Sequence, residues 1–233
     1  MSETSIKSNL KIEIKEFLKI AVPLASAQIA QATTGFIDTI LMMITGILTG
    51  VSPAIAQAYG AGNNRRVGQI MRQGLWLALI LTVPGMLFLS HLDTLMLKWG
   101  QAPTIVNSAN SYLDTMVWGL FLVLGFAVLR SLVSSISQAR PVMVIVIVAT
   151  IFNTIGNYTL AFGKFGFPKM ELVGLATASA IAHCLMFVFL LIYVLGHKSL
   201  NRFQLFQNFH KIDPKILWEL VWVGFPIGIL AII

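Results

Sequence analysis

Long apolar runs separated by short polar segments make up most of this sequence. The runs are continuous and about 20 residues long, which is the length that an α-helix needs to cross the hydrocarbon core of a bilayer. A transmembrane barrel would instead show ten-residue stretches in which apolar and polar residues alternate. After a compressed first region, the predicted helices span residues 74–90, 112–135, 142–162, 172–196 and 215–233, with polar connections at 91–111, 163–171 and 197–214. The pattern therefore predicts an all-α integral membrane protein.

The first apolar region is unusually short for the crossings that it has to hold. At about 1.5 Å per residue, the stretch from Ile20 to Asn64 holds two spans only if a very tight turn joins them. Gly46-xxx-Gly50 suits a close crossing of helices. The segment that starts at Tyr59 and ends at Asn64 predicts a helix stop followed by a new helix N-cap. We expect two short helices or a re-entrant hairpin in this region.

Composition and charge agree with a membrane location. Hydrophobic residues make up 57% of the chain and charged residues 11%, whereas a soluble domain carries about 25% charged residues. The net charge of +7 would fit a nucleic-acid partner, but the basic residues lie between the apolar segments and therefore indicate membrane topology.

With the N-terminus inside, thirteen Lys and Arg residues would face the cytoplasm and three would face the other side. The positive-inside rule predicts a multi-pass protein of the plasma (inner) membrane with a cytoplasmic N-terminus and no nucleic-acid partner.

We expect four parts along the chain. They are a cytoplasmic tail at 1–15, a six-helix transmembrane lobe at 16–196 that is compressed at 36–50, a cytoplasmic loop between lobes at 197–214, and the truncated start of a second lobe at 215–233. An internal repeat indicates the second lobe, because the segments Glu16 to Pro23 and Glu219 to Pro226 share a Glu, an apolar pattern, a small residue and a Pro. Repeated helix sets are frequent in secondary transporters, whose substrate sites lie between the two halves.

One stretch of the first region carries the polar residues Gln28, Gln31, Thr34 and Asp38. At about 100° per residue they fall within about 120° of a helix, so this helix would have one polar stripe that includes a carboxylate. A lone carboxylate at membrane depth costs roughly 2.5–3.5 kcal/mol on insertion scales, and such residues usually face a cavity or an ion path. Asp38 is therefore a candidate cation ligand. The alternative is that it caps a turn or hydrogen-bonds a neighbouring helix.

A second polar face lies on the predicted helix at 142–162, where Thr150, Asn153 and Asn157 fall within about 60°. Carboxylate, amide and hydroxyl oxygens suit Na⁺, whereas a carboxylate alone suits a proton. Hydrogen bonds between helices explain such asparagines equally well.

The sequence offers little support for an enzyme. Enzyme chemistry would need paired carboxylates, a cluster of metal ligands or an activated nucleophile. The scattered acidic residues and the four histidines show no such spacing. We therefore expect no enzymatic activity, no cofactor, and no metal site beyond Na⁺ at Asp38.

Three blocks of sequence resemble those of one transporter family. The stretch from Pro23 to Asp38 is similar to the first-helix signature of the multidrug and toxic-compound extrusion (MATE) transporters. The stretch from Ser52 to Gly74 resembles their second helix and the following loop, and that from Asn153 to Pro168 resembles their fifth helix and the next turn. In addition, Gly224-Phe-Pro226 matches the start of their second lobe.

This resemblance implies twelve helices in two six-helix lobes, and export of cationic, amphipathic drugs in exchange for Na⁺ or H⁺. It implies cation-coupling roles for four residues: Asp38, Asn153, Asn157 and, by a looser alignment, Ser179. Some family members have Asp where this chain has Asn157, so a second acidic ligand is missing. Gln28, Gln31 and Thr34 are candidates for the wall of the substrate cavity.

The chain departs from the family pattern in two places. Between Asp38 and Ser52 it lacks roughly two dozen residues that the family has, and it stops inside the seventh helix. We therefore expect its partners to be the lipid bilayer, small cationic substrates, and a second lobe or a second copy of the chain. Two alternatives stay open, namely a lipid-linked precursor flippase of similar architecture and a truncated membrane fragment that does not transport.

Overall fold

The computed structural model describes residues 42–98, 103–163, 170–205 and 209–230, and these residues form helices and turns with no β-strand. Residues 42–49 are helical and lead into the first labelled helix. The helices are α2 (Val51–Gly60), α3 (Asn64–Ser90), α4 (Leu92–Lys98), α5 (Pro103–Ser135), α6 (Ala139–Phe162), α7 (Glu171–Gly196), α8 (Lys198–Asn201) and α9 (Pro214–Leu230). The prediction of an all-α protein is confirmed.

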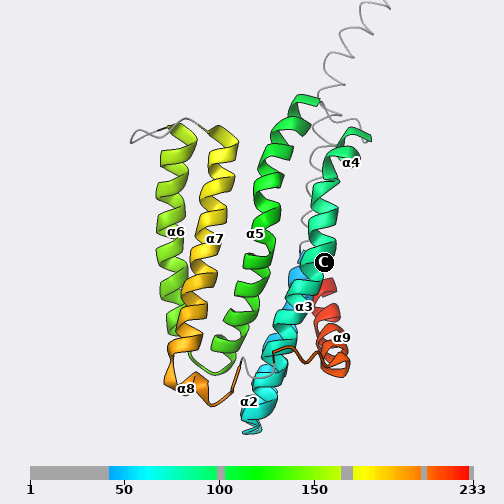
Figure 1. Cartoon of the computed structure of the whole chain (residues 1–233), viewed down its shortest axis with the longest axis vertical. Helices are drawn as coiled ribbons and strands as arrows, with labels where there is room; N and C mark the ends of the chain where they lie inside the picture. Colours follow the sequence, from blue (N-terminus) through cyan, green and yellow to red (C-terminus); the bar gives the residue numbers. More distant parts are fainter. Residues whose placement is uncertain (1–41, 99–102, 164–169, 206–208, 231–233) are drawn as a thin grey trace, which may run out of the picture.

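The four longest described helices, α3, α5, α6 and α7, form the bundle (Figure 1). Helix α5 packs against both α3 and α7, and α7 also packs against α6. Helices α2 and α8 and the first residues of α9 lie at one end of the bundle, which we call the α8 end, and α4 lies at the opposite end (Figure 1). Each long helix therefore runs from one end to the other.

The long helices end where the sequence pattern predicts. The last residues of α3, α5, α6 and α7 are Ser90, Ser135, Phe162 and Gly196. The expected polar connection at 91–111 is wrong, because α4 and the start of α5 occupy most of it. Asp93 in the first turn of α4 and Lys98 in its last turn complement the helix dipole, and Pro103 suits the first position of α5. The charged residues at the two ends of α4 therefore stabilise a helix in a segment whose polarity predicts a loop.

The predicted stop between α2 and α3 is confirmed. Gly62 has φ +71°, a left-handed conformation that glycine adopts without a steric penalty. The next residue, Asn63, caps α3, because its Oδ1 accepts a hydrogen bond of 3.0 Å from the backbone N–H of Arg66.

Three helices in the described part of the chain are long and apolar enough to cross a membrane. They are α3, residues Ala139–Leu160 of α6 and residues Val173–Gly196 of α7. The second half of α5, Gly119–Ser135, is a shorter apolar stretch. Helix α6 exposes many large apolar side chains, including Val144, Ile147, Val148, Ile151 and Ile155. Such a face on a spanning helix suits contact with lipid or with another membrane helix.

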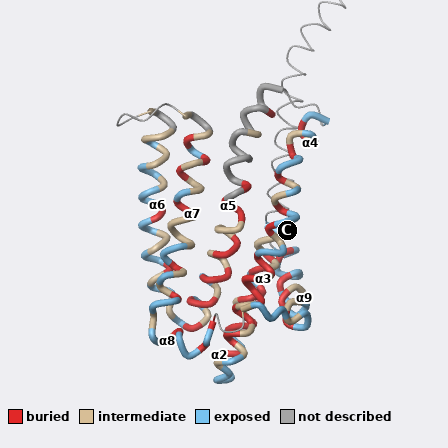
Figure 2. The backbone as a smooth tube through the Cα atoms, viewed as in Figure 1, coloured by how far each residue is buried: buried red, intermediate tan, exposed pale blue. Residues whose placement is uncertain are grey.

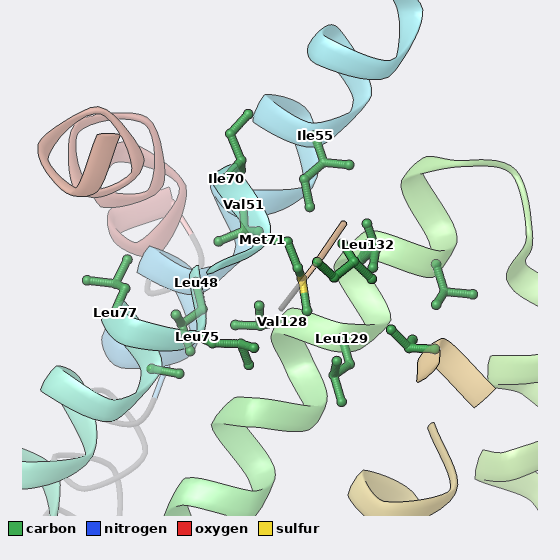
Figure 3. Packing of buried hydrophobic residues seen from close by; sticks show 14 of the residues in the cluster. Leu48, Val51, Ile55, Ile70, Met71, Leu75, Leu77, Val128, Leu129 and Leu132 are labelled. Atoms are coloured by element: carbon green, nitrogen blue, oxygen red, sulfur yellow. The ribbon is translucent and has the colours of Figure 1, made fainter. Parts of the chain in front are cut away.

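The main core lies between α2, α3 and α5, where buried residues are dense (Figure 2). Figure 3 shows Val51 and Ile55 of α2 facing Ile70 and Met71 of α3 and Leu132 of α5. All five side chains are at most 2% exposed. This packing fixes the α8 end of the bundle.

The described basic residues are divided unequally between the two ends of the bundle. The α8 end carries Arg65 at the start of α3, Arg140 at the start of α6, Lys198 on α8 and Lys215 near the start of α9 (Figure 1). Lys98 closes α4 at the other end. This grouping agrees with the topology prediction, and the cytoplasmic orientation of the α8 end stays a prediction.

The predicted close crossing at Gly46 and Gly50 is confirmed, and the partner helix is α9. A Cβ added to Gly46 would overlap the backbone of Gly228. A Cβ added to Gly50 would lie 2.6 Å from the backbone nitrogen of Gly224. The two Gly-xxx-Gly faces therefore pack backbone against backbone.

The expected lobe division, including the compression at 36–50, stays a prediction. Most of the first crossing region, residues 16–41, lies outside the described residues, as does the tail at 1–15.

Candidate functional site

Three of the four predicted cation-coupling residues come together between α6 and α7. Asn153 donates a hydrogen bond of 3.2 Å from Nδ2 to the Ser179 hydroxyl on α7. Asn157, one turn further along α6, donates a bond of 3.0 Å from its Nδ2 to Oδ1 of Asn153. We call Asn157, Asn153 and Ser179 the polar row. All three residues are half-buried.

Small residues bring the two helices close enough for these short side chains to meet. Gly156 lies on α6 between the two asparagines, and a Cβ added there would be 3.1 Å from the Cβ of Ala178 on α7. Ala178 is 1% exposed. Close approach through small residues is typical of helix contacts in membranes, and here it sets the geometry of the polar row.

One atom of the polar row has an unfilled hydrogen-bonding capacity. Oδ1 of Asn157 is buried and has no hydrogen-bond partner among the described residues. A buried acceptor without a partner costs about 1–3 kcal/mol, so it favours a cation or an additional donor close to it.

His183 extends the polar row on α7, and sequence reasoning passed over it. Its Nδ1 lies 2.7 Å from the carbonyl oxygen of Ser179, and because a carbonyl only accepts, Nδ1 carries the proton. Among the described residues, the other ring nitrogen, Nε2, has no hydrogen-bond partner. The four-residue spacing from Ser179 puts His183 on the same helix face, and this is the signal in the sequence that indicates it.

Other predicted residues do not join the polar row. Thr150 is exposed, and its hydroxyl donates to the carbonyl of Val146 in its own helix at 2.8 Å. Asp38, Gln28, Gln31 and Thr34 lie outside the described residues, so their roles stay predictions. Within the described ranges, no three His, Cys, Asp or Glu side chains are grouped so that they could hold a metal.

A small apolar cavity lies in the middle of the bundle. It has a volume of about 200 Å³ and is lined by side chains of α3, α5 and α7, including Trp76, Phe121 and Phe187, and by Phe209 in the segment before α9. Sites for drug-sized ligands usually have volumes of about 300–1,000 Å³. This cavity is therefore too small to be a drug site by itself.

The long apolar helices define a helical membrane protein with several spans. The polar row forms a polar site between two of these helices. The MatE family model matches residues 20–159. The chain belongs to the MatE family.

Curated relatives agree with this assignment. The chain is 49% identical to the probable multidrug resistance protein NorM of Synechocystis sp., in an alignment that covers 100% of the chain and 56% of the relative. It is 29% identical to the multidrug resistance protein NorM of Vibrio cholerae over 94% of the chain and 53% of the relative. The chain thus spans about half the length of the curated relatives that it matches.

Solved structures show the same fold. The inward-facing conformation of a multidrug resistance MATE family transporter of the MOP superfamily matches with a TM-score of 0.76 and 19% identity, over 90% of this chain and 46% of that chain. The outward-facing conformation of such a transporter matches with a TM-score of 0.73, over 94% of this chain and 49% of that chain.

The Synechocystis relative is longer within the matched region. The alignment has 256 positions, whereas this chain has 233 residues, so the relative carries residues without a counterpart here. That the missing residues follow Asp38 stays a prediction.

Proposed function

We propose that this chain is one half of a secondary antiporter that exports cationic, amphipathic compounds in exchange for Na⁺ or H⁺. The observation that carries the proposal is the polar row, in which the buried Oδ1 of Asn157 has no partner among the described residues. Curated relatives are named multidrug resistance proteins, which supports drug export and does not favour the alternative of a lipid-linked precursor flippase.

The polar row supplies neutral oxygen ligands. Amide and hydroxyl oxygens coordinate Na⁺ well, because Na⁺ is a hard cation that resembles Ca²⁺ and Mg²⁺ in its preference for oxygen. Asn153 and Asn157 carry no charge, so the charge that balances a cation has to come from another residue. Asp38 is the proposed source, because its carboxylate can hold either a proton or Na⁺.

Exchange follows if ion and drug favour different arrangements of the two lobes. A ligand shifts a conformational equilibrium only by the difference between its affinities for the two states. In transporters with repeated helix sets, the substrate site lies at the interface of the repeats. The proposed function therefore needs a second lobe, supplied by a second chain or a second copy. We place the protein in the plasma (inner) membrane with its N-terminus in the cytoplasm.

The test uses vesicles that contain the full chain together with the second half of the Synechocystis relative. Efflux of the cationic dye ethidium is measured under an imposed Na⁺ or pH gradient. We expect Asp38→Asn to abolish the response to both gradients, because it keeps the shape of the side chain and removes its charge. Thr150→Val is the matched control, because the Thr150 hydroxyl bonds to its own helix. Wild-type efflux in Asp38→Asn would disprove the coupling role of Asp38.

A further inference from the structure

A cavity of about 900 Å³ lies at the α8 end, away from the polar row. Its wall is formed by the first turns of α3, the segment that follows α8, and the start of α9. It is far larger than the apolar cavity inside the bundle and is large enough for a polar headgroup.

The wall of this cavity is strongly basic. Arg65, Arg72, Arg202 and Lys211 line it, and Asp213 is the one acid among the described residues of the wall. Oδ1 of Asp213 already accepts a hydrogen bond of 3.0 Å from the backbone N–H of Lys215. Four positive charges around one space repel each other, so an anion inside the cavity would relieve that repulsion.

Two helix N-termini add to the positive potential. The cavity is lined by Asn64, the first residue of α3, and by Pro214, the first residue of α9. These helices have 27 and 17 residues. The N-terminal end of a helix carries a partial positive charge that attracts an anion. Asn63 and Asp213 each accept a hydrogen bond from one backbone N–H of these first turns, so here the helix ends contribute mainly through that charge.

The cavity wall is held in place by specific bonds between α3 and the segment before α9. Arg72 donates a hydrogen bond of 2.9 Å to the carbonyl of Gln204. Gln73 is 3% exposed. It donates to the carbonyl of Lys211 at 2.9 Å and accepts from the backbone N–H of Asp213 at 3.1 Å. The site is therefore pre-formed, which lowers the entropic cost of binding.

Arg202 is also held in position on this wall. Its guanidinium lies 5.5 Å from the centre of the Tyr59 ring and 4.8 Å from that of Phe203. One Nη of Arg202 also donates a hydrogen bond of 3.3 Å to the Tyr59 hydroxyl. The other N–H groups of a stacked guanidinium can donate to phosphate oxygens.

The position of the cavity indicates the source of the anion. It adjoins the first turns of α3, a helix long enough to cross a membrane, so it lies near a bilayer face. Basic pockets between membrane helices at such a face suit anionic lipid headgroups. We propose that this cavity binds the phosphate of an anionic phospholipid headgroup such as phosphatidylglycerol. This proposal does not depend on transport.

The test uses the full chain purified in a neutral detergent. Its melting temperature is followed while short-chain phosphatidylglycerol, short-chain phosphatidylcholine or inorganic phosphate is added. We expect phosphatidylglycerol alone to stabilise the chain. The double variant Arg65→Gln/Lys211→Gln removes two exposed charges and leaves the Arg72 and Gln73 tethers intact. It should weaken the apparent affinity about 30-fold, which corresponds to about 2 kcal/mol for the two basic residues together.

Arg140→Gln is the matched control, since Arg140 is an exposed arginine at the α8 end that does not line the cavity. It should bind phosphatidylglycerol as the unmodified chain does. Equal stabilisation by phosphatidylcholine, or an equal loss in Arg140→Gln, would overturn the site. Stabilisation by inorganic phosphate alone, with the same loss in the double variant, would overturn the lipid as its source.

Discussion

Gly50 and Gly224 lie so close that a Cβ on Gly50 would be 2.6 Å from the backbone nitrogen of Gly224. This contact joins the helical segment before α2 to α9. Gly46 and Gly228 repeat the contact one turn away along both helices. The position of α9 against the bundle therefore depends on residues that have no side chain.

Replacing either contact glycine should separate the two helices. Gly50→Leu forces a side chain into the backbone of α9, and overpacking of this kind typically costs about 1–3 kcal/mol. We expect a lower melting temperature of the full chain in detergent. Gly60→Ala is the control, because a Cβ at Gly60 meets nothing within 4 Å. Equal melting temperatures for the two variants would contradict the close crossing.

A surface ion pair also joins α9 to the bundle. Arg66 of α3 and Glu219 of α9 approach to 2.5 Å, with side chains 38% and 46% exposed. Exposed pairs contribute about 0.2–1 kcal/mol, and salt screens them. A double-mutant cycle with Arg66→Gln and Glu219→Gln should give a coupling energy in this range that shrinks as salt concentration rises. A coupling energy unaffected by salt would argue against a solvent-exposed pair.

Asn157 should matter more for ion binding than for folding. Asn157→Leu breaks its bond to Asn153 but also removes the buried Oδ1 that has no partner among the described residues. These effects oppose each other, so we expect the free energy of unfolding to change by less than about 1 kcal/mol.

If the proposed coupling role is correct, stabilisation of the chain by added NaCl over KCl should disappear in Asn157→Leu. Asn157→Asp should instead strengthen the Na⁺ response, because it adds an acidic ligand. An unchanged Na⁺ response in both variants would exclude Asn157 as a ligand.

Cysteine labelling tests the orientation in the membrane. Single cysteines are placed at Arg65, at the α8 end, and at Lys98, at the opposite end, in a Cys184→Ser background. A membrane-impermeant maleimide added to intact cells should label the cysteine at position 98 and leave the one at position 65 unlabelled. Labelling at position 65 would reverse the predicted topology.

Drug resistance should require more than this chain alone. We expect its expression in a pump-deficient host to leave sensitivity to ethidium unchanged, because the proposed substrate cavity lies between two lobes. Co-expression with the second half of the Synechocystis relative is the comparison. Resistance from the chain alone would contradict this expectation and would indicate that two copies of the chain can form the substrate cavity between them.

Much of the fold could be predicted from the sequence because membrane helices are local structures. A run of apolar residues has to satisfy its backbone groups within its own helix, so the change to polar residues marks the ends at Ser90, Ser135 and Gly196. The turn at Gly62 and the cap at Asn63 are equally local. Helical spacing predicts that Asn153 and Asn157 share a face, and the resemblance implies a related role for Ser179. The structure places these three residues in contact.

Other features depend on contacts between residues far apart in the chain, and only the tertiary structure decided them. The Gly46-xxx-Gly50 pattern predicts a close crossing but does not name α9 as its partner. Gln73 appears in the sequence as one polar residue near an apolar run, yet it binds the backbone of Lys211 and Asp213 and helps to form the basic cavity. Sequence spacing within one helix determines which side chains share a face, whereas packing between helices determines what each face meets.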